Sequence, residues 1–242
     1  YVGYTAPPFA NIFIPQNEDD LFPRDFIINI PAPTNYIGPE KVFGTSIIPD
    51  DTNSDLLPII YPIKDYDFFV PQGHKKDDDK PKFEDIPESL RIAVKCFIVT
   101  CAIRIARGQG TRHNSMLIHV SRFQMWQNHI KELVENLFNY YKHEIEASDT
   151  AIYEEFRKIL EDDTANYKSY KTITNEIKES KFSDIDKNLS VHSWEEIKPQ
   201  LFKAVQKIEV KSINGTSGDC LTYYENEKNG ISVIAEIHLS IL

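Results

Sequence analysis

Residues 89–141 decide the fold, and their centre reads Gly108-Gln-Gly-Thr-Arg-His-Asn-Ser-Met-Leu-Ile-His-Val-Ser-Arg-Phe123. Within this stretch, the run from Ser115 to Ser121 is short and apolar, and its residues do not alternate between apolar and polar. Such a run is typical of a strand that is covered on both faces, as strands of parallel sheets are. We therefore expect a buried strand at this position.

Apolar side chains recur at the helical period on both sides of this strand. They recur from Leu90 to Ile105 before it and from Phe123 to Tyr141 after it, which predicts two helices that each have one apolar face. Gly108 and Gly110 end the first helix. Helix, buried strand and helix form the repeating unit of a doubly wound sheet, so the predicted fold class is α/β.

Ligands of doubly wound sheets bind beyond the carboxyl ends of the strands. Here that position is Val120-Ser121-Arg122. Arginine suits phosphate recognition, so one interpretation is that Ser121 and Arg122 contact a ligand. The other is that they are a capping serine and a surface arginine, and the sequence leaves both open. Thr5-Ala-Pro-Pro8 follows the first predicted strand at an equivalent edge, where an ordinary proline-rich turn is the alternative.

The chain has 242 residues and a formal net charge of −10. This acidic balance argues against non-specific nucleic-acid binding by a free-standing domain, although it does not exclude a local basic groove. Cys96, Cys101 and Cys220 have no paired spacing, which indicates reduced thiols and a cytoplasmic protein. We find no segment that would span a membrane.

Thirteen of the fourteen prolines precede residue 90, and this is the sharpest change of composition in the chain. Because proline interrupts helices and strand ladders, we expect mostly irregular structure there, with short strands at Tyr1–Tyr4, Phe26–Ile30 and Leu56–Tyr61. The charged run from His74 to Lys82 is interpreted as a solvated loop and not as a metal site. Asp85 and Pro87 stand where a cap and an early proline would begin the helix at Leu90.

The second half of the chain reads as a charged helical insertion followed by two strands. Helices are predicted at Ala151–Leu160 and Thr172–Glu179. Ser193 and Glu196 form a capping-box pattern ahead of a third apolar stripe. The strands are predicted at Ile208–Ile213 and Ile231–Ile237. Both ends of the sequence read as unfinished strands, so we expect an internal piece of a larger protein.

Two further residue patterns could take part in catalysis. His119 falls inside the predicted buried strand, where a hydrogen-bonded core histidine is the main interpretation and a catalytic one the alternative. Glu209-Val-Lys211 has the E-x-K spacing of restriction-type nucleases, and Asp50 could be its acidic partner. The other carboxylates cluster in segments predicted to be solvated, so we expect no metal-dependent cleavage.

Several blocks of the sequence together resemble the Z-one domain, a family of endonuclease-like domains in large bacterial and fungal proteins built on a superfamily 2 helicase ATPase core. The blocks are Tyr1–Asn11, Leu21–Ile27, Tyr36–Gly44 and His113–Phe123, and Asn214–Asp219 and Ile231–Ala235 are similar to later ones. The residues that carry the family pattern are Tyr4, Pro8, Asn11, Arg24, Asp25, Gly38, Lys41, His113, Asn114, His119, Asn214, Gly215 and Gly218.

The resemblance implies RecA-like lobes. Residues 1–87 would hold the last strand of a first lobe, with helicase motif III, and a proline-rich connection. Residues 88–242 would be a truncated second lobe, with motif IV at Met116–Phe123 and a charged helical insertion at about 143–190. Pro7 stands where the family's T-A-T-P motif has its second threonine, which removes a hydroxyl and a backbone N–H.

The resemblance also implies roles for residues and partners. Thr5 and Arg122 would act in coupling or phosphate contact, and nucleic acid would be bound by Ser121, Arg122, Arg112 and Arg107. No metal ligands are assigned. ATP and Mg²⁺ are implied for the full-length protein and no cofactor for this chain alone, because the phosphate loop and the late arginine motif are absent. The implied partners are DNA and the missing N-terminal ATPase lobe, with no membrane.

Three functions stay open at this point. The first is a helicase-like, nucleic-acid-handling ATPase fragment that is inactive in isolation. The second is a binding module that contacts nucleic acid or a protein without catalysis. The third is a metal-dependent nuclease. The sequence does not decide whether this chain is an enzyme.

Overall fold

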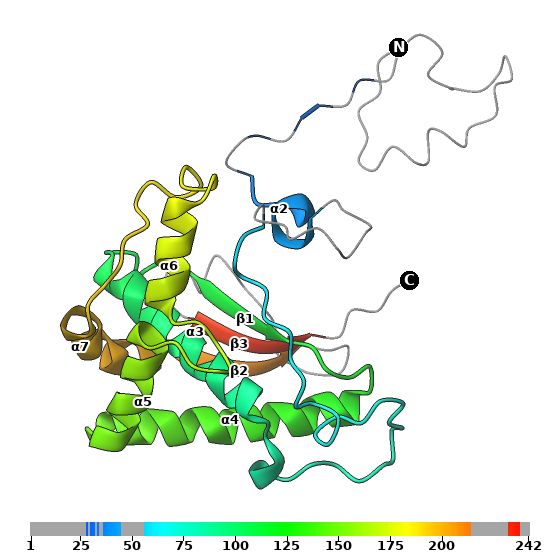
Figure 1. Cartoon of the computed structure of the whole chain (residues 1–242). Helices are drawn as coiled ribbons and strands as arrows, with labels where there is room; N and C mark the ends of the chain where they lie inside the picture. Colours follow the sequence, from blue (N-terminus) through cyan, green and yellow to red (C-terminus); the bar gives the residue numbers. More distant parts are fainter. Residues whose placement is uncertain are drawn as a thin grey trace, which may run out of the picture. The chain divides into compact units, whose positions relative to one another are not determined.

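The computed structural model describes residues 28, 30–31, 33, 36–44, 56–213 and 232–237. Residues Ile37–Leu242 form one compact unit, and Tyr1–Tyr36 belong to another. The larger unit is a mixed α/β structure with a small parallel sheet and several helices (Figure 1). The α/β class predicted from the helix, strand and helix between residues 89 and 141 is therefore confirmed.

In the described part of the chain, the sheet has three parallel strands in the order β1–β3–β2. Their bounds are Asn114–Ile118 for β1, Ile208–Ile213 for β2 and Ser232–Ile237 for β3. Met116 of β1 lies opposite Ile234 of β3, which in turn lies opposite Val210 of β2. The two predicted C-terminal strands are thus confirmed, and the last strand of the sequence occupies the centre of the sheet.

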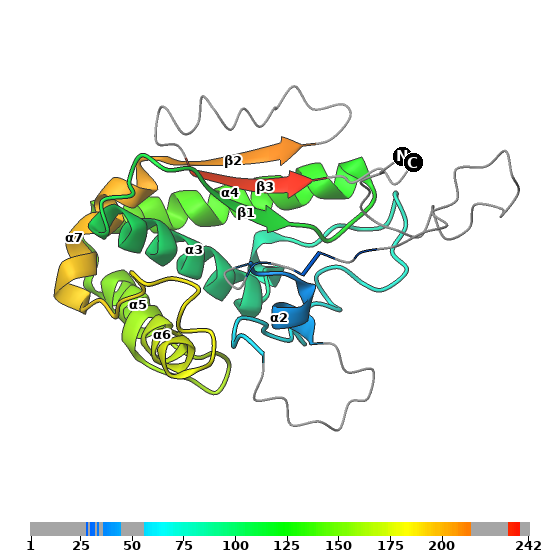
Figure 2. The ribbon, with the colours of Figure 1, turned by 90° about the horizontal axis from the view of Figure 1, so that it is seen from above.

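Helices cover one face of this sheet. Helix α3 (Glu88–Ala106) and helix α4 (Gln124–Glu146) lie on the same side of it (Figures 1 and 2). Ile118, Ile208 and Ile234 point toward that side and are buried. Helix α7 (Trp194–Val205) packs along α3 and contributes Leu201, which is fully buried.

The prediction that the first strand is covered on both faces is wrong. The side chains of β1 alternate between the two faces, and Ser115 and Leu117 on the face away from α4 are exposed, Leu117 by 53%. The uninterrupted apolar run misled the prediction because β1 is an edge strand whose helices lie on one side. Burial on one side needs an apolar residue only at every second position.

The charged insertion forms a further helical layer. Helix α5 (Thr150–Glu161) and helix α6 (Tyr170–Glu179) lie on the side of α3 that is opposite to the sheet (Figure 2). Asp149 and Ser169 cap them by accepting backbone N–H groups. Helix α5 buries Phe156 completely, whereas α6 buries only Thr174. Both predicted helices are confirmed, and α6 is the more weakly attached of the two.

The described residues before α3 are mostly irregular, as the prolines predict. They include helix α2 (Pro39–Phe43) and the 3-10 helix η1 (Phe83–Asp85). The predicted strand at Leu56–Tyr61 is wrong, because these residues form a bend and a turn. Pro58 and Pro62 remove two of the backbone donors that a ladder would need. Phe69 and Ile86 anchor the segment in the core.

The start of α3 is capped differently from the prediction. Asp85 accepts the backbone N–H of Lys82 at 2.7 Å, inside η1, and Pro87 is the N-cap residue without a side-chain hydrogen bond. Asp65 takes the helix donor instead, since its Oδ2 accepts the N–H of Ser89 at 3.0 Å. A carboxylate there satisfies an unpaired N–H and the positive end of the helix dipole.

Several predictions fall outside the described residues. They are the strand at Tyr1–Tyr4, most of the strand at Phe26–Ile30, and the blocks Tyr1–Asn11, Leu21–Ile27 and Asn214–Asp219. Ile28 and Ile30 are described, and neither is in a strand. Cys101 is a free, buried thiol and Cys96 a free, half-buried one. None of the helices in the described ranges combines the length and apolar composition that crossing a membrane requires.

Candidate functional site at the carboxyl edge of the sheet

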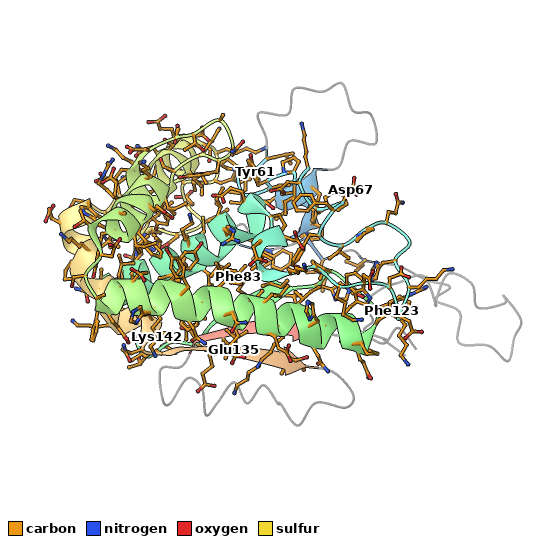
Figure 3. All side chains as sticks on the ribbon, turned by 90° about the horizontal axis from the view of Figure 1, so that it is seen from below. Tyr61, Asp67, Phe83, Phe123, Glu135 and Lys142 are labelled. Carbon is orange, nitrogen blue, oxygen red and sulfur yellow. The ribbon has the colours of Figure 1, made fainter. Side chains whose placement is uncertain are left out.

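The edge predicted to hold a ligand lies between β1 and α4. Ser121 and Arg122 follow the last residue of β1, and Gln124 begins α4. Ser121 is 4% exposed, whereas Arg122 is exposed. The guanidinium carbon of Arg122 lies 4.9 Å from the centre of the Phe123 ring, over its face. Figure 3 shows Phe123 at the start of α4, with Glu135 and Lys142 further along the same helix.

The Ser121 hydroxyl is bonded to a histidine from a distant segment. Its Oγ lies 2.7 Å from Nε2 of His74, and Nδ1 of His74 lies 3.1 Å from the carbonyl oxygen of Pro71. A carbonyl oxygen can only accept, so Nδ1 carries the hydrogen. In the neutral ring Nε2 is then the acceptor, and the Ser121 hydroxyl donates to it. Oγ also accepts the backbone N–H of Phe123 at 3.1 Å.

The loop that carries His74 is fixed to the first turns of α4. Nε1 of Trp126 donates to the carbonyl oxygen of Lys75 at 2.9 Å, and Nε2 of His129 lies 2.6 Å from the carbonyl oxygen of Pro81. The rings of His74 and Trp126 are 4.5 Å apart, centre to centre. Most side chains of this loop are exposed, as predicted, but its backbone is tied to the helix.

This arrangement can present positive charge beside the sheet edge. Arg122 is exposed, and Nζ of Lys80 lies 5.8 Å from the centre of the Trp126 ring. The Ser121 hydroxyl can reach a ligand only if His74 moves, because its hydrogen is used by Nε2. At this edge the Arg122 side chain is therefore accessible to a ligand, whereas the Ser121 hydroxyl becomes accessible only when His74 moves.

The other predicted arginines lie at the opposite end of β1. Arg107 and Arg112 precede the strand and Arg122 follows it, so the strand's length of roughly 16 Å lies between them. Nη1 of Arg107 lies 3.7 Å from Oδ2 of Asp186, and the Arg107 side chain is 15% exposed. Arg112 is exposed on the loop before β1. The described structure thus brings Arg107 toward an acidic partner and does not bring it near Arg122.

Two of the five family-pattern residues in the described part of the chain, His113 and Asn114, lie at this amino-terminal end. The carbonyl oxygen of His113 lies 3.4 Å from Nη1 of Arg104, and Nδ2 of Asn114 donates to Oγ of Ser232 at 3.0 Å, which joins β1 to β3. Gly38 is buried at the N-cap of α2, and the carbonyl of Lys41 accepts the N–H of Leu57 at 2.9 Å. Tyr4, Thr5, Pro8, Asn11, Arg24, Asp25, Asn214, Gly215 and Gly218 lie outside the described residues.

The interpretation of His119 as a core histidine is wrong. This residue follows the last residue of β1 and is exposed. The strand ends at Ile118, earlier than the apolar run does, so the position that the pattern assigns to the core lies on the surface. His119 remains within two residues of Ser121, on the same edge of the sheet.

The residues of the E-x-K pattern lie on β2. Oε2 of Glu209 lies 3.0 Å from Nζ of Lys211, and Glu209 is exposed. In the described part of the chain, no three histidine, cysteine or acidic side chains are placed to hold a metal ion together. Asp50, the suggested partner of Glu209, lies outside the described residues.

Sequence reasoning missed His74, which is the closest side-chain partner of Ser121. It lies 47 residues before Ser121, in a run whose charge indicated only a solvated loop. Neither periodicity nor spacing could connect the two residues, because a loop residue reaches the sheet through tertiary packing. One signal in the sequence was available. Trp126 and His129 have polar ring atoms that need hydrogen-bond partners when they pack at the start of a helix, and this indicated that another segment would cover them.

The fold and its edge define an α/β domain with a parallel sheet and an exposed arginine beyond the carboxyl end of its first strand. The family model for the Z1 domain matches residues 89–236, which run from the start of α3 into β3. This is more than half of the chain, and the chain belongs to the Z1 domain family. The resemblance to the Z-one domain is confirmed to that extent. No curated protein and no solved structure matches the chain.

Proposed function

We propose that residues 88–242 of this chain are the second RecA-like lobe of a helicase-like ATPase that handles nucleic acid, and that Arg122 contacts the nucleic-acid backbone. The supporting observation is the exposed Arg122 immediately beyond the carboxyl end of a parallel strand. Ligands of open α/β sheets bind at this edge, and a guanidinium matches the geometry of phosphate oxygens. The chain belongs to the Z1 domain family, and the helicase core that the sequence resemblance implies is consistent with the same proposal.

The residues present do not by themselves fit ATP and Mg²⁺. The sequence has no phosphate loop, and the described edge offers one exposed arginine and a serine whose hydroxyl is bonded to His74. We derive no step through the nucleotide. In this proposal an N-terminal ATPase lobe supplies the nucleotide site. Residues 1–87 form the end of that lobe and the proline-rich connection to the second lobe, and DNA is the nucleic acid.

The test is the binding of fluorescently labelled single- and double-stranded oligonucleotides, followed by anisotropy at several salt concentrations. We expect weak, salt-sensitive binding by the wild-type chain. Arg122→Ala should weaken it about three- to tenfold at about 50 mM salt and lower the slope of log K against log salt by about 1. Lys203→Ala is the matched control, because Lys203 is an exposed cation on α7 and should change neither quantity.

Equal weakening in both variants would contradict the proposed site, since it would indicate diffuse attraction to surface charge. Arg112→Ala examines the other end of β1, and it should leave the slope nearer to the wild-type value than Arg122→Ala does. The second candidate is a module that contacts nucleic acid or a protein without catalysis. If the wild-type chain does not bind nucleic acid at all, the protein-binding form of this candidate replaces the first proposal.

Enzyme assays separate the remaining alternatives. We expect no ATP turnover by the chain alone, and a measurable turnover that Arg122→Ala abolishes would contradict this. We also expect no plasmid or single-strand cleavage with Mg²⁺ or Mn²⁺. Metal-dependent nicking that is lost in Glu209→Ala would establish the nuclease in place of the helicase-like lobe.

A further inference from the structure

The α6–α7 loop (residues 180–193) is held to the carboxyl-terminal end of α3 by one arginine. In Figure 1 this loop runs from α6 to the start of α7. Nε of Arg107 lies 3.2 Å from Nε2 of His192, and Nη2 lies 3.5 Å from the carbonyl oxygen of Ser190. Nη1 faces Asp186 at 3.7 Å. The guanidinium therefore spans most of the loop with three contacts.

The contact between Arg107 and His192 requires an acceptor nitrogen on the ring. An arginine N–H can only donate, so Nε2 of His192 must be an unprotonated acceptor. The neutral ring then carries its hydrogen on Nδ1, which lies 3.5 Å from Oε2 of Glu196. The contacts of the ring with Arg107 and with Glu196 therefore favour the same tautomer, the one with its hydrogen on Nδ1. The guanidinium lies on one side of the ring and the carboxylate on the other.

A proton on Nε2 would place two N–H donors against each other at 3.2 Å, one of them on a cation. The protonated ring has other partners within reach. Oγ of Ser190 lies 3.2 Å from the same Nε2 and can accept its hydrogen. Nδ1 keeps Glu196, whose pKa is held below its ordinary value by the N–H of Ser193 and, further, by His192. Glu196 therefore stays anionic in mildly acidic solution.

We propose that Arg107 and His192 form a proton-operated latch that holds the α6–α7 loop on α3 when the ring is neutral and releases it when the ring is charged. The charged and titratable groups that face His192 in the described structure are Arg107 from α3 and Glu196 from α7, and Asp186 of the loop faces Arg107. On protonation the ring stays with Glu196 and Ser190, and Arg107 loses its acceptor.

Few other contacts hold the loop in place once its contacts with Arg107 are lost. Helix α6 buries only Thr174, and Phe182 is the buried apolar residue at the beginning of the loop. The hydrogen bonds of Ser183, Ile185 and Leu189 each close a local turn and reach no other element. The release therefore opens residues 183–189, while residues 190–193 stay with α7 and α3, α5 and α7 keep their packing in the core.

The test compares amide hydrogen exchange of residues 183–189 at about pH 7.5 and about pH 5.5, after correction for intrinsic rates, in wild type and three variants. We expect the wild-type loop to lose about five- to tenfold protection at the lower pH. His192→Gln keeps an uncharged acceptor for Arg107 and should show the same protection at both values. His143→Gln changes an exposed histidine of α4 and should behave as wild type. Arg107→Gln should be unprotected at both.

An absent pH response in the wild type, or an undiminished response in His192→Gln, would overturn the proposal. A second measurement does not depend on any variant. The ¹⁵N chemical shifts of the imidazole at about pH 7.5 should identify Nδ1 as the protonated nitrogen of His192 and Nε2 as the bare one. The opposite tautomer, or a ring already charged at that pH, would also overturn it.

Discussion

Different kinds of contact hold the neighbouring segments in place at the two ends of β1. At the carboxyl end, a proline-rich segment forms hydrogen bonds to the starts of two helices, through Asp65 to α3 and through His74 and Lys75 to the region around α4. At the amino end, the guanidinium of Arg107 gathers a loop by contacts with Asp186 and His192. One end is built on hydrogen bonds in a packed setting and the other on a single charged side chain.

Two arginines of the same sequence neighbourhood consequently differ in what they can do. Arg107 and Arg122 were both predicted to bind nucleic acid, and both flank the same strand. Arg107 is 15% exposed and has its contacts within the chain, whereas Arg122 is exposed and stacks on Phe123. An arginine that already has a carboxylate partner contributes little charge to an outside ligand. The difference indicates that the acidic content of the neighbouring loop, more than the arginine itself, decides its availability.

The largest expected effect is at the carboxyl end. Trp126 is 1% exposed and donates to the carbonyl of Lys75, so Trp126→Ala leaves a large cavity and an unpaired carbonyl. We expect a loss of about 3–5 kcal/mol in the free energy of unfolding, measured by denaturant titration. Phe202→Ala is the control, because Phe202 on α7 is 49% exposed and should cost less than about 1 kcal/mol. Similar losses in the two variants would remove the contrast between the ends.

An intermediate effect is expected where the same segment caps α3. Burial raises the pKa of Asp65, but the hydrogen bonds from Ser89 outweigh it, and the pKa lies below its ordinary value. Asp65→Ala should therefore cost about 1–2 kcal/mol near neutral pH. Because the folded pKa is lowered, this contribution is present above the ordinary value of about 3.9 and is lost as the pH falls through the folded value.

The measurement is the stability of wild type and Asp65→Ala from neutral to acidic pH, where the two curves should converge. Asp67→Ala is the matched control, since Asp67 is an exposed aspartate in the same segment (Figure 3). A gap between wild type and Asp65→Ala that stays constant down to strongly acidic pH would contradict the role of the ionised carboxylate as a cap.

The smallest effect is expected at the amino end. Asp186 faces Arg107 at 3.7 Å with its side chain 43% exposed, so solvent screens this pair. Asp186→Ala should change the free energy of unfolding by no more than about 0.5 kcal/mol. Thermal unfolding with and without added salt measures this. A loss above about 1.5 kcal/mol would show that the amino end depends on ion pairing as strongly as the carboxyl end depends on Trp126.

Patterns within the sequence predicted what depends on neighbours along the chain. The helical period located α3, α4 and α5, and the capping box of Ser193 and Glu196 is present at the start of α7. Apolar runs located β2 and β3. Each of these signals arises from contacts within a few residues or from one face of a single element, which are physical effects that a short stretch of sequence carries by itself.

What could not be predicted depends on residues that meet only in the folded chain. Asp65 caps a helix that begins more than twenty residues later, and His74 binds the Ser121 hydroxyl across 47 residues. The one-sided burial of β1 depends on which face the helices cover, and Leu117 is exposed because it lies on the other face. Ser121 and Arg122 lie beyond the carboxyl end of β1, as predicted, but the hydrogen bonds around Ser121 could not be predicted from the sequence.

The position of β3 has a consequence for the order of events during synthesis. Strands β1 and β2 both pair with β3, and among the described strands neither has another partner. Asn114 of β1 bonds to Ser232 of β3, which follows 118 residues later. During synthesis, helices α3 to α7 are therefore complete before β1 or β2 can pair with β3. Long-range pairing is slow and local helices are fast, so the helical layers form first and shield Ile118 and Val210. The sheet that carries the candidate site is therefore the last part of the domain to form.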